Sequence, residues 1–398
     1  MADNKKNERK ASAKKRNRSR LLKFNSRIFK IIAVIVVLVV LIVIAAAKVG
    51  NITIASVGDS VQASVSGLSS GDGYPYAIQN SDVSDMSITN SDIVLVYDDA
   101  VRIIDSTAKN ISEISHSYSH PIVDCNSSRI LLYDIGGKSF RLQSKTRVLY
   151  ENTLDHMILT GAIGKDGSVA IASRTSGAES MLTVYDSRNR EVFKWECSKE
   201  QIVACDVSDN GKTYACAVMS VDNGSIYSKL YLFKKNSSEA YASFEYTDSA
   251  IAKIDFLSNE SLMVLGNDFC QVIKGNELKE DINVSINTPS MLYISENNTA
   301  MLVLSKYSST TEKIVEVYDK AGNKLYDFDV NGIIKAISTD GKFATVLTDK
   351  NVLIYNRKGE LCADYDVSSD ASDVIVSSRY TYIYFADKIE QYSSIKKD

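Results

Sequence analysis

Proline, histidine and tryptophan are scarce in this chain of 398 residues, which contains three, three and one of them. Between the predicted strands of its repeat, no stretch shows the apolar periodicity of a helix of about 10–15 residues, which disfavours repeats that alternate strands with helices. The chain also lacks a P-loop, a dinucleotide-binding glycine pattern, G-x-S-x-G and H-E-x-x-H. These absences exclude the enzyme classes that depend on those motifs. Tyrosine is frequent, with 22 copies, and with valine and isoleucine it favours strands.

The few histidines do not form a recognisable catalytic or metal site. His116 and His120 are four residues apart, a spacing that suits a metal site on a helix. They stand before Pro121 in a segment that we expect to be a solvated loop between repeats. His156 follows Asp155, and adjacent residues of a strand point to opposite faces. We therefore predict no catalytic, cofactor-binding or metal-binding residue and no cofactor.

Cysteines are also few, and none belongs to a C-x-x-C pair. The six are Cys125, Cys197, Cys205, Cys216, Cys270 and Cys362. Most lie in apolar strand patterns, so we interpret them as small buried side chains. An even number permits disulfides outside the cytosol, and the expected pair is then Cys205 and Cys216, which flank one predicted hairpin. The acidic turn at Asp209 lacks the ligand spacing of a calcium loop and is interpreted as turn chemistry.

One long apolar run occurs, and it predicts a membrane anchor. Residues 31–47 carry no polar side chain, and about 17–25 such residues cross a bilayer. Residues 1–30 hold twelve Lys and Arg against Asp3 and Glu8, a local charge of +10, and positive charge stays on the cytoplasmic side. We predict a basic cytoplasmic tail over 1–30 and a transmembrane helix over 31–49. The protein is then a single-pass plasma-membrane protein with an extracytoplasmic C-terminal part. A signal peptide cleaved after residues 45–47 is the alternative, which the long basic segment disfavours.

The part of the chain after the apolar run is acidic. The whole chain carries −3, so the part after residue 47 carries −13. This charge argues against nucleic acid or an anionic surface as its main partner. Glycine and serine are frequent in its first part, and we interpret residues 50–73 as a linker. Residues 74–398 are long enough for one large domain with its own core.

From Thr89 onward the sequence repeats loosely, with a period of about 41 residues. Each unit begins with an apolar strand that ends in a small polar residue and a turn, often Asp-Gly or Asn-Gly, which predicts a hairpin. These marker residues are Thr89, Asn126, Gly164, Ser208, Ser258, Ser295, Ser338 and Ser377. A second strand follows, and a third is predicted to end in Tyr-Asp or Tyr-Asn, at Tyr97, Tyr133, Tyr185, Tyr318 and Tyr355. A Gly-bearing turn and a fourth strand complete a unit of the size of a β-propeller blade.

The number of blades follows from the two ends of the repeat. After Ser377 only half a unit remains, without a fourth strand. Residues 74–79 precede the first marker as a fourth strand would, so we predict that they complete the last blade and close the ring. This predicts an eight-bladed propeller with four-stranded blades. The unit between Asn126 and Gly164 is the weakest, and without it seven blades remain.

The basic segment before a single span, the sequence Gly-Tyr-Pro-Tyr-Ala-Ile at 73–78 and the repeated Val-Tyr-Asp units resemble a bacterial family of membrane-anchored β-propeller proteins that is uncharacterised. The resemblance covers nearly the whole chain. It implies a WD40-like or quinoprotein-like propeller outside the membrane of a Gram-positive bacterium, and it implies no catalytic residue. The Tyr-Asp ends are similar to the Trp-Asp of WD repeats, although the Gly-His partner of that motif is absent.

Two functions of different classes are compatible with these features. We expect a binding or scaffolding protein, not an enzyme, whose loops hold envelope proteins or cell-wall material and not nucleic acid. The alternative is an enzyme or small-ligand sensor with a site in the central channel, since several blades can build such a site without a local motif. A channel lined by carboxylates and histidines would favour the alternative, and a broad tyrosine-rich face would favour the scaffold.

Overall fold

Every regular element among the described residues is a β-strand, and no helix occurs among them. The computed structural model describes residues 70–78, 83–222, 224–282, 287–307, 309–377 and 379–395. The predicted tail (1–30), the predicted transmembrane helix (31–49) and the predicted linker up to residue 69 lie outside them. The chain divides into two units, and the second, Gln62–Asp398, contains all the described strands. The all-β prediction is therefore confirmed for this unit.

The strands form eight antiparallel sheets of four strands each, which are the blades of a propeller. Blade 1 contains β2 (Val83–Thr89), β3 (Asp92–Tyr97), β4 (Ala100–Ile104) and β5 (Asn110–Ser115), and blade 2 contains β6 (Pro121–Cys125), β7 (Ile130–Asp134), β8 (Ser139–Gln143) and β9 (Val148–Thr153). Blade 3 contains β10 (Ile158–Ile163), β11 (Val169–Ser173), β12 (Ser180–Tyr185) and β13 (Glu191–Cys197), and blade 4 contains β14 (Gln201–Val207), β15 (Thr213–Asp222), β16 (Ser225–Lys234) and β17 (Ala242–Thr247). Blade 5 contains β18 (Ile251–Phe256), β19 (Ser261–Gly266), β20 (Cys270–Lys274) and β21 (Glu277–Ile282), and blade 6 contains β22 (Asn287–Ile294), β23 (Ala300–Lys306), β24 (Glu312–Tyr318) and β25 (Lys324–Asn331). Blade 7 contains β26 (Ile334–Thr339), β27 (Ala344–Thr348), β28 (Asn351–Tyr355) and β29 (Leu361–Asp366), and blade 8 contains β30 (Asp373–Ser377), β31 (Tyr380–Tyr384), β32 (Lys388–Ser393) and β1 (Tyr76–Ala77). Eight blades are thus present, and the weakest repeat of the sequence forms a complete blade 2.

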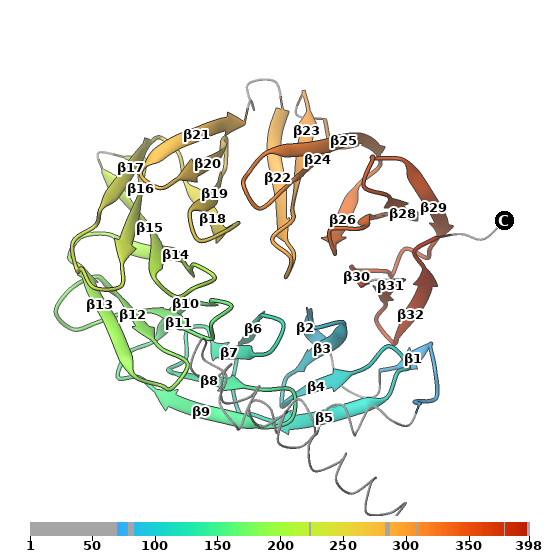
Figure 1. The fold of residues 1–398 in the computed structure, drawn as a ribbon, viewed down its shortest axis with the longest axis horizontal. Helices are drawn as coiled ribbons and strands as arrows, with labels where there is room; N and C mark the ends of the chain where they lie inside the picture. The colour runs from blue at the N-terminus through green and yellow to red at the C-terminus, as the bar shows by residue number, and fades with distance from the viewer. Residues whose placement is uncertain are drawn as a thin grey trace, which may run out of the picture. The chain divides into compact units, whose positions relative to one another are not determined.

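Figure 1 shows the blades around a common centre, with the first strand of each nearest the centre and the fourth at the rim. Because the four strands of a blade are antiparallel, successive turns alternate between the two sides of the ring. We call the side with the turns between first and second strands, and between third and fourth strands, the N-terminal face. The side with the turns between second and third strands, and with the connections between blades, is called the opposite face.

The N-terminal strand closes the ring as predicted. Tyr76 in β1 pairs with Ile389 in β32, and the backbone N–H of Ile78 donates to the Asp387 carbonyl at 2.8 Å. Just before this strand, the Gly71 N–H donates to Thr107 Oγ1 at 2.7 Å. Thr107 lies in the turn between β4 and β5, so the chain joins the propeller on the N-terminal face.

The hydrophobic core consists of eight separate clusters, one between each pair of neighbouring blades. A middle strand therefore contacts another blade on both of its sides. In β7, β11 and β19 every residue is buried. This double burial explains why these segments are short continuous apolar runs without polar alternation.

The Tyr-Asp pairs do not all end a third strand, and here the sequence prediction is wrong in part. Tyr185, Tyr318 and Tyr355 end the third strands of blades 3, 6 and 7. Tyr97 ends β3, and Tyr133 lies in β7, and both are second strands. A five- or six-residue apolar run has no feature that reveals its position within a sheet whose middle strands are all buried.

The acidic residue after a third strand braces the turn that follows it. Asp319 Oδ1 accepts the backbone N–H groups of Ala321 at 2.8 Å and Asn323 at 2.9 Å. Between them Gly322 has φ +78°, a conformation that favours glycine. Asp186 makes the same pair of bonds in blade 3. The Tyr-Asp…Gly signature of the repeat therefore reflects turn geometry.

Candidate functional site

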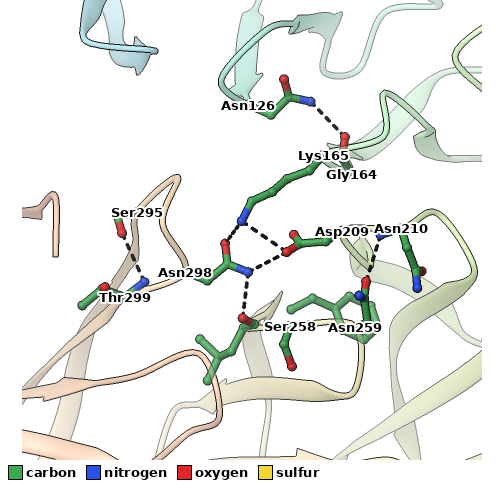
Figure 2. A network of polar contacts seen from close by, with 12 residues as sticks. Asn126, Gly164, Lys165, Asp209, Asn210, Ser258, Asn259, Ser295, Asn298 and Thr299 are labelled. Atoms are coloured by element: carbon green, nitrogen blue, oxygen red, sulfur yellow. Dashed lines mark hydrogen bonds and ion pairs between the residues drawn. The ribbon is translucent and has the colours of Figure 1, made fainter. Parts of the chain in front are cut away.

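The marker residues of the repeat lie at the centre of the N-terminal face, where they join neighbouring blades. The Thr89 hydroxyl donates to the Asn126 carbonyl at 2.7 Å. Asn126 Nδ2 donates to the Gly164 carbonyl at 2.9 Å (Figure 2). A Cβ at Gly164 would lie 2.9 Å from the Ser208 carbonyl, so this position has no room for a side chain. The hydrogen bonds made by Thr89 and Asn126 are both buried. The marker residues of the repeat therefore stand where the inner strand of one blade is joined to the next blade.

Polar side chains also link blades that are not neighbours. Lys165, in the turn after β10, bonds to Asn298 Oδ1 in the turn after β22, and its Nζ lies 3.2 Å from Asp209 Oδ2. Asn298 Nδ2 in turn donates to Asp209 Oδ2 at 3.0 Å and to the Leu257 carbonyl at 2.7 Å. Figure 2 shows the side chains of Lys165, Asp209 and Asn298 converging from three different turns. The Leu257 carbonyl, in the turn after β18, adds the fourth. Blades 3, 4, 5 and 6 are thus tied together across the centre of the ring.

Glu296, in the same turn of blade 6, provides a further link, to blade 1. Its two carboxylate oxygens accept the backbone N–H of Asn90 at 3.0 and 3.2 Å. Burial raises the pKa of Glu296, and the Asn90 N–H and the positive charges of Lys145 and Lys165 oppose that rise. The turn between β22 and β23 is therefore the hub of the polar network on this face.

A pocket of about 110 Å³ adjoins Glu296. Its lining comes from the first strands of blades 1, 6, 7 and 8 and the turns that follow them, and it includes Ser91, Tyr293, Glu296, Asn297, Asp340 and Lys342. The pocket is polar, with two carboxylates and one ammonium group at its wall. It is the candidate small-ligand site on the N-terminal face.

Carboxylates also occur on the inner strands, and two of them, Asp124 and Asp206, serve the joints between blades. Asp124 Oδ2 in β6 accepts the N–H of Ile163 in β10 at 2.8 Å, and Asp206 Oδ2 in β14 accepts the N–H of Phe256 in β18 at 2.5 Å. Burial raises the pKa of Asp124 to about 6. Burial and the charge of Asp255 raise the pKa of Asp206 well above its usual range. Asp124 and Asp206 stand two residues before their markers, a signal that the sequence contains.

Asp373 is an inner-strand carboxylate whose charge is expected to cost stability at neutral pH. Its Oδ1 accepts the N–H of Val374 at 2.7 Å, and burial, followed by the charge of Asp85, raises its pKa to about 6. A carboxyl with a raised folded-state pKa adds stability below its unfolded pKa and loses it as the pH rises through about 6. Asp373→Asn keeps the acceptor oxygen and removes the charge. We expect this variant to be more stable than the wild type at pH 8 by on the order of 1 kcal/mol, and to have a smaller advantage at pH 5.

Urea unfolding of both proteins at the two pH values measures this difference. Asp98→Asn, at an exposed position on the opposite face, removes the same charge. It should have the same small effect on the free energy of unfolding at both pH values. An Asp373→Asn advantage that does not depend on pH would contradict the assignment.

The three histidines lie in connections on the opposite face and do not meet in one site. His116 Nε2 lies 3.0 Å from the Tyr97 carbonyl, and its Nδ1 accepts the Tyr118 N–H at 3.2 Å. Since a carbonyl only accepts, Nε2 carries the proton and neither nitrogen is left for a metal. Burial and the charge of Arg141 lower the pKa of His116. In the described part of the chain, no group of three His, Cys, Asp or Glu residues is placed to hold a metal ion.

The six cysteines are free thiols, so the conditional Cys205–Cys216 disulfide is not formed. The hairpin that we expected does bring the two residues opposite each other in β14 and β15. Both are buried in the apolar cluster between blades 3 and 4, together with Cys197. Burial raises the pKa of Cys205 and of Cys216, which disfavours the reactive thiolate. Their role as small buried side chains is therefore the one that the structure supports.

Exposed apolar side chains gather at hairpin tips and connections of the opposite face. β15 and β16 have ten residues each and are the longest strands of the ring. Near their tip Val221 pairs with Ile226, and these side chains are 70% and 41% exposed. Tyr307, in the turn after β23, is 77% exposed, and Ile333, before β26, is 54% exposed. Aromatic and aliphatic groups that stand out of a polar surface are typical of protein interfaces.

Solved propellers share this fold. The crystal structure of the C-terminal WD40 domain of Sif2 matches with a TM-score of 0.55 and 15% identity, covering 81% of this chain and 98% of that domain. Sqt1 of Saccharomyces cerevisiae matches with a TM-score of 0.55 and 9% identity, covering 82% of this chain and 100% of Sqt1. At these identities the likeness shows the WD40-like propeller fold alone. A search of curated proteins finds no match.

The membrane anchor and the bacterial source that the sequence predicts stay predictions. Within the parts of the chain that the structure describes, no helix has the length and apolar character to cross a membrane. The family profile described as "Family of unknown function (DUF5711)" matches residues 74–392, which include all eight blades. This chain therefore belongs to the DUF5711 family.

Proposed function

We propose that this protein is a membrane-anchored, extracytoplasmic propeller that binds envelope proteins or cell-wall material through its opposite face. The observation that carries this proposal is the exposed apolar tip of the β15–β16 hairpin, where Val221 is 70% exposed. A side chain of this kind is costly in water unless a partner covers it. Tyr307 and Ile333 are further exposed apolar side chains on the same face, at blade 6.

The anchoring part of the proposal is supported by the sequence. The charge of +10 before the apolar run of residues 31–47 favours a cytoplasmic N-terminus. The propeller would then lie outside the cytoplasm, and protease added to intact protoplasts should digest it.

Among the described residues, the local engagement of the inner-strand carboxylates and of His116 supports binding over catalysis. The inner-strand carboxylates Asp124 and Asp206 are engaged by backbone N–H groups, and none of the three histidines lies beside them. Both ring nitrogens of His116 are used in local contacts. Acid–base or metal chemistry needs a group whose proton or lone pair is available to a substrate.

The proposal is tested by substituting residues of the opposite face and measuring whether the protein still crosslinks to its partner. The full chain, with a photo-crosslinking side chain at Tyr307, is expected to crosslink to a partner in its native membrane. Val221→Ser with Ile226→Ser should reduce this crosslinking at least about tenfold, because interface hot spots of this kind contribute about 2 kcal/mol or more. Leu325→Ser with Leu361→Ser, at similarly exposed rim positions, is the matched control. Equal crosslinking of the two double variants would refute the proposed binding face.

A second candidate is a small-ligand sensor that uses the pocket beside Glu296. The polar lining of this pocket, with Asp340 and Lys342 on one side, is the observation that favours it. Native mass spectrometry of the full chain would then show a bound small molecule, and Asn297→Trp, which fills the pocket, would remove it.

A further inference from the structure

Positive charge is concentrated on one face of the propeller, which the net charge of the chain conceals. The described turns of the N-terminal face contain fourteen Lys and Arg and ten Asp and Glu. The described turns and connections of the opposite face contain only four Lys and Arg, again with ten Asp and Glu. The two faces therefore differ almost entirely in their basic residues, and the N-terminal face has the surplus of positive charge.

The acids of the N-terminal face are largely occupied within the fold. Asp319 and Asp186 accept backbone N–H groups of their own turns. Asp209 pairs with Lys165, and Glu296 accepts the Asn90 N–H at the centre of the ring. These carboxylates are consequently turned into the structure, which leaves the basic side chains to dominate the surface of this face.

Many of the basic side chains point into solvent. Arg188, Lys212, Lys320, Lys342, Lys358 and Arg379 are exposed, and they come from blades 3, 4, 6, 7 and 8. They are thus distributed around the ring and not concentrated in one blade. A broad, shallow array of this kind suits a flat anionic surface better than a single small anion.

The chain joins the propeller on this same face. The N–H groups of Gly71 and Gly73 donate to Thr107 in the turn between β4 and β5, at 2.7 and 3.0 Å. The described residues just before β1 therefore lie on the basic side, and a tether that precedes them is joined to the propeller there. A tether raises the local concentration of the surface it leads to, so individually weak contacts become effective.

We propose that the N-terminal face docks on the anionic headgroups of the membrane that anchors the chain, so that the acidic, apolar-tipped opposite face points outward. This inference rests on the proposed anchoring. It assigns different partners to the two faces: lipid headgroups to the basic one and macromolecules to the other. Each Lys or Arg near such a surface contributes modestly, and several together give a salt-sensitive orientation.

The experiment uses the full chain in nanodiscs of phosphatidylcholine alone or mixed with phosphatidylglycerol, with amine labelling read by mass spectrometry. In the anionic discs we expect Lys212 and Lys342 to be labelled about three- to tenfold more slowly than in neutral discs. Lys138 and Lys350, on the opposite face, should be labelled equally in both. High salt should abolish the difference at Lys212 and Lys342. Equal labelling of these two lysines in both lipids would overturn the proposal.

Two charge-matched triple variants test which face is responsible. Arg188→Glu, Lys320→Glu and Lys358→Glu change the N-terminal face, and Lys138→Glu, Lys199→Glu and Lys350→Glu change the opposite face by the same charge. The first triple should lose the protection of Lys212 and Lys342, and the second should keep it. The same protection in both triples would contradict docking through the N-terminal face.

Failure of the anchoring has a different signature. In that case the chain is recovered outside the discs, and flotation of the same full chain with vesicles decides the lipid contact. Residues 1–30, with their charge of +10, are the same in all three proteins and bind anionic vesicles equally. Weaker salt-sensitive flotation of the first triple than of the wild type and the second triple therefore supports the docking face. Equal flotation of the first triple and the wild type overturns it.

Discussion

Deleting residues 73–80 should lower the free energy of unfolding of the propeller by on the order of 5 kcal/mol, whereas deleting residues 60–67 should leave it unchanged. The first deletion removes β1, the Ile78 bond to the Asp387 carbonyl and the packing of Tyr74 and Tyr76 against blade 8. It also exposes the edge of β32, which has no other partner on that side. The second deletion has the same length, and it ends before Gly71, the first residue whose contact with blade 1 is seen.

The single tryptophan is a suitable probe for this comparison. Trp195 packs against Tyr231 and Phe233, with ring centroids 5.1 and 5.0 Å away, in the cluster between blades 3 and 4. This cluster is distant in the sequence from the strand pair that closes the ring. A shift in the urea midpoint of Trp195 fluorescence therefore shows that the whole ring is lost cooperatively. Equal midpoints for the two deletions would mean that the ring does not depend on its N-terminal strand.

Gly322→Ala should destabilise the propeller by about 3 kcal/mol, and Gly275→Ala by only about 1 kcal/mol. Both glycines have positive φ, +78° and +62°, so both variants carry the conformational cost of an L-residue in the left-handed region. They differ in the room available for a methyl group. A Cβ at Gly322 would lie 2.4 Å from Val272 Cγ1, whereas a Cβ at Gly275 meets no atom within 4 Å. Val272 is buried in the cluster between blades 5 and 6 and cannot move without disturbing its neighbours.

Chemical denaturation of the two alanine variants separates the steric cost from the conformational one. A third variant, Gly322→Ala with Val272→Ala, tests the cause directly. It should recover part of the loss at Gly322 relative to the sum of the two single changes, because the clash no longer exists. Strict additivity of the two changes would show that the contact with Val272 is not the source of the cost.

The propeller fold was predictable from the sequence because its signals are local. Markers such as Thr89 and Asn126 recur at each blade joint, and their hydrogen bonds to the next blade explain why small polar residues stand there. The missing half unit after Ser377 was enough to predict closure by an N-terminal strand. The order of strands within a blade was less predictable: Tyr97 ends a second strand, since fully buried strands have no alternation that shows their place.

The candidate site was not predictable, because its residues are distant in the sequence. Lys165 and Asn298 are separated by 133 positions, and Asn90 and Glu296 by 206. None of these residues belongs to a recognisable motif, and each looks like an ordinary turn residue. The histidines, which are the usual markers of chemistry, proved to be separate residues of the opposite face.

The sequence by itself determined the strand content and the repeat, since both follow from periodicity and turn chemistry within about one blade length. The prediction of eight blades and of ring closure came from the two ends of the repeat, where the incomplete unit after Ser377 is matched by residues 74–79. Only the tertiary structure decided how charge is distributed. The value of −13 for the part after residue 47 does not describe the charge of either face. Several acids of the N-terminal face brace hairpins or join blades, while most of its lysines and arginines are exposed. Which turns share a face depends on the alternation of antiparallel strands around a closed ring, and that relation exists only after the ring has closed.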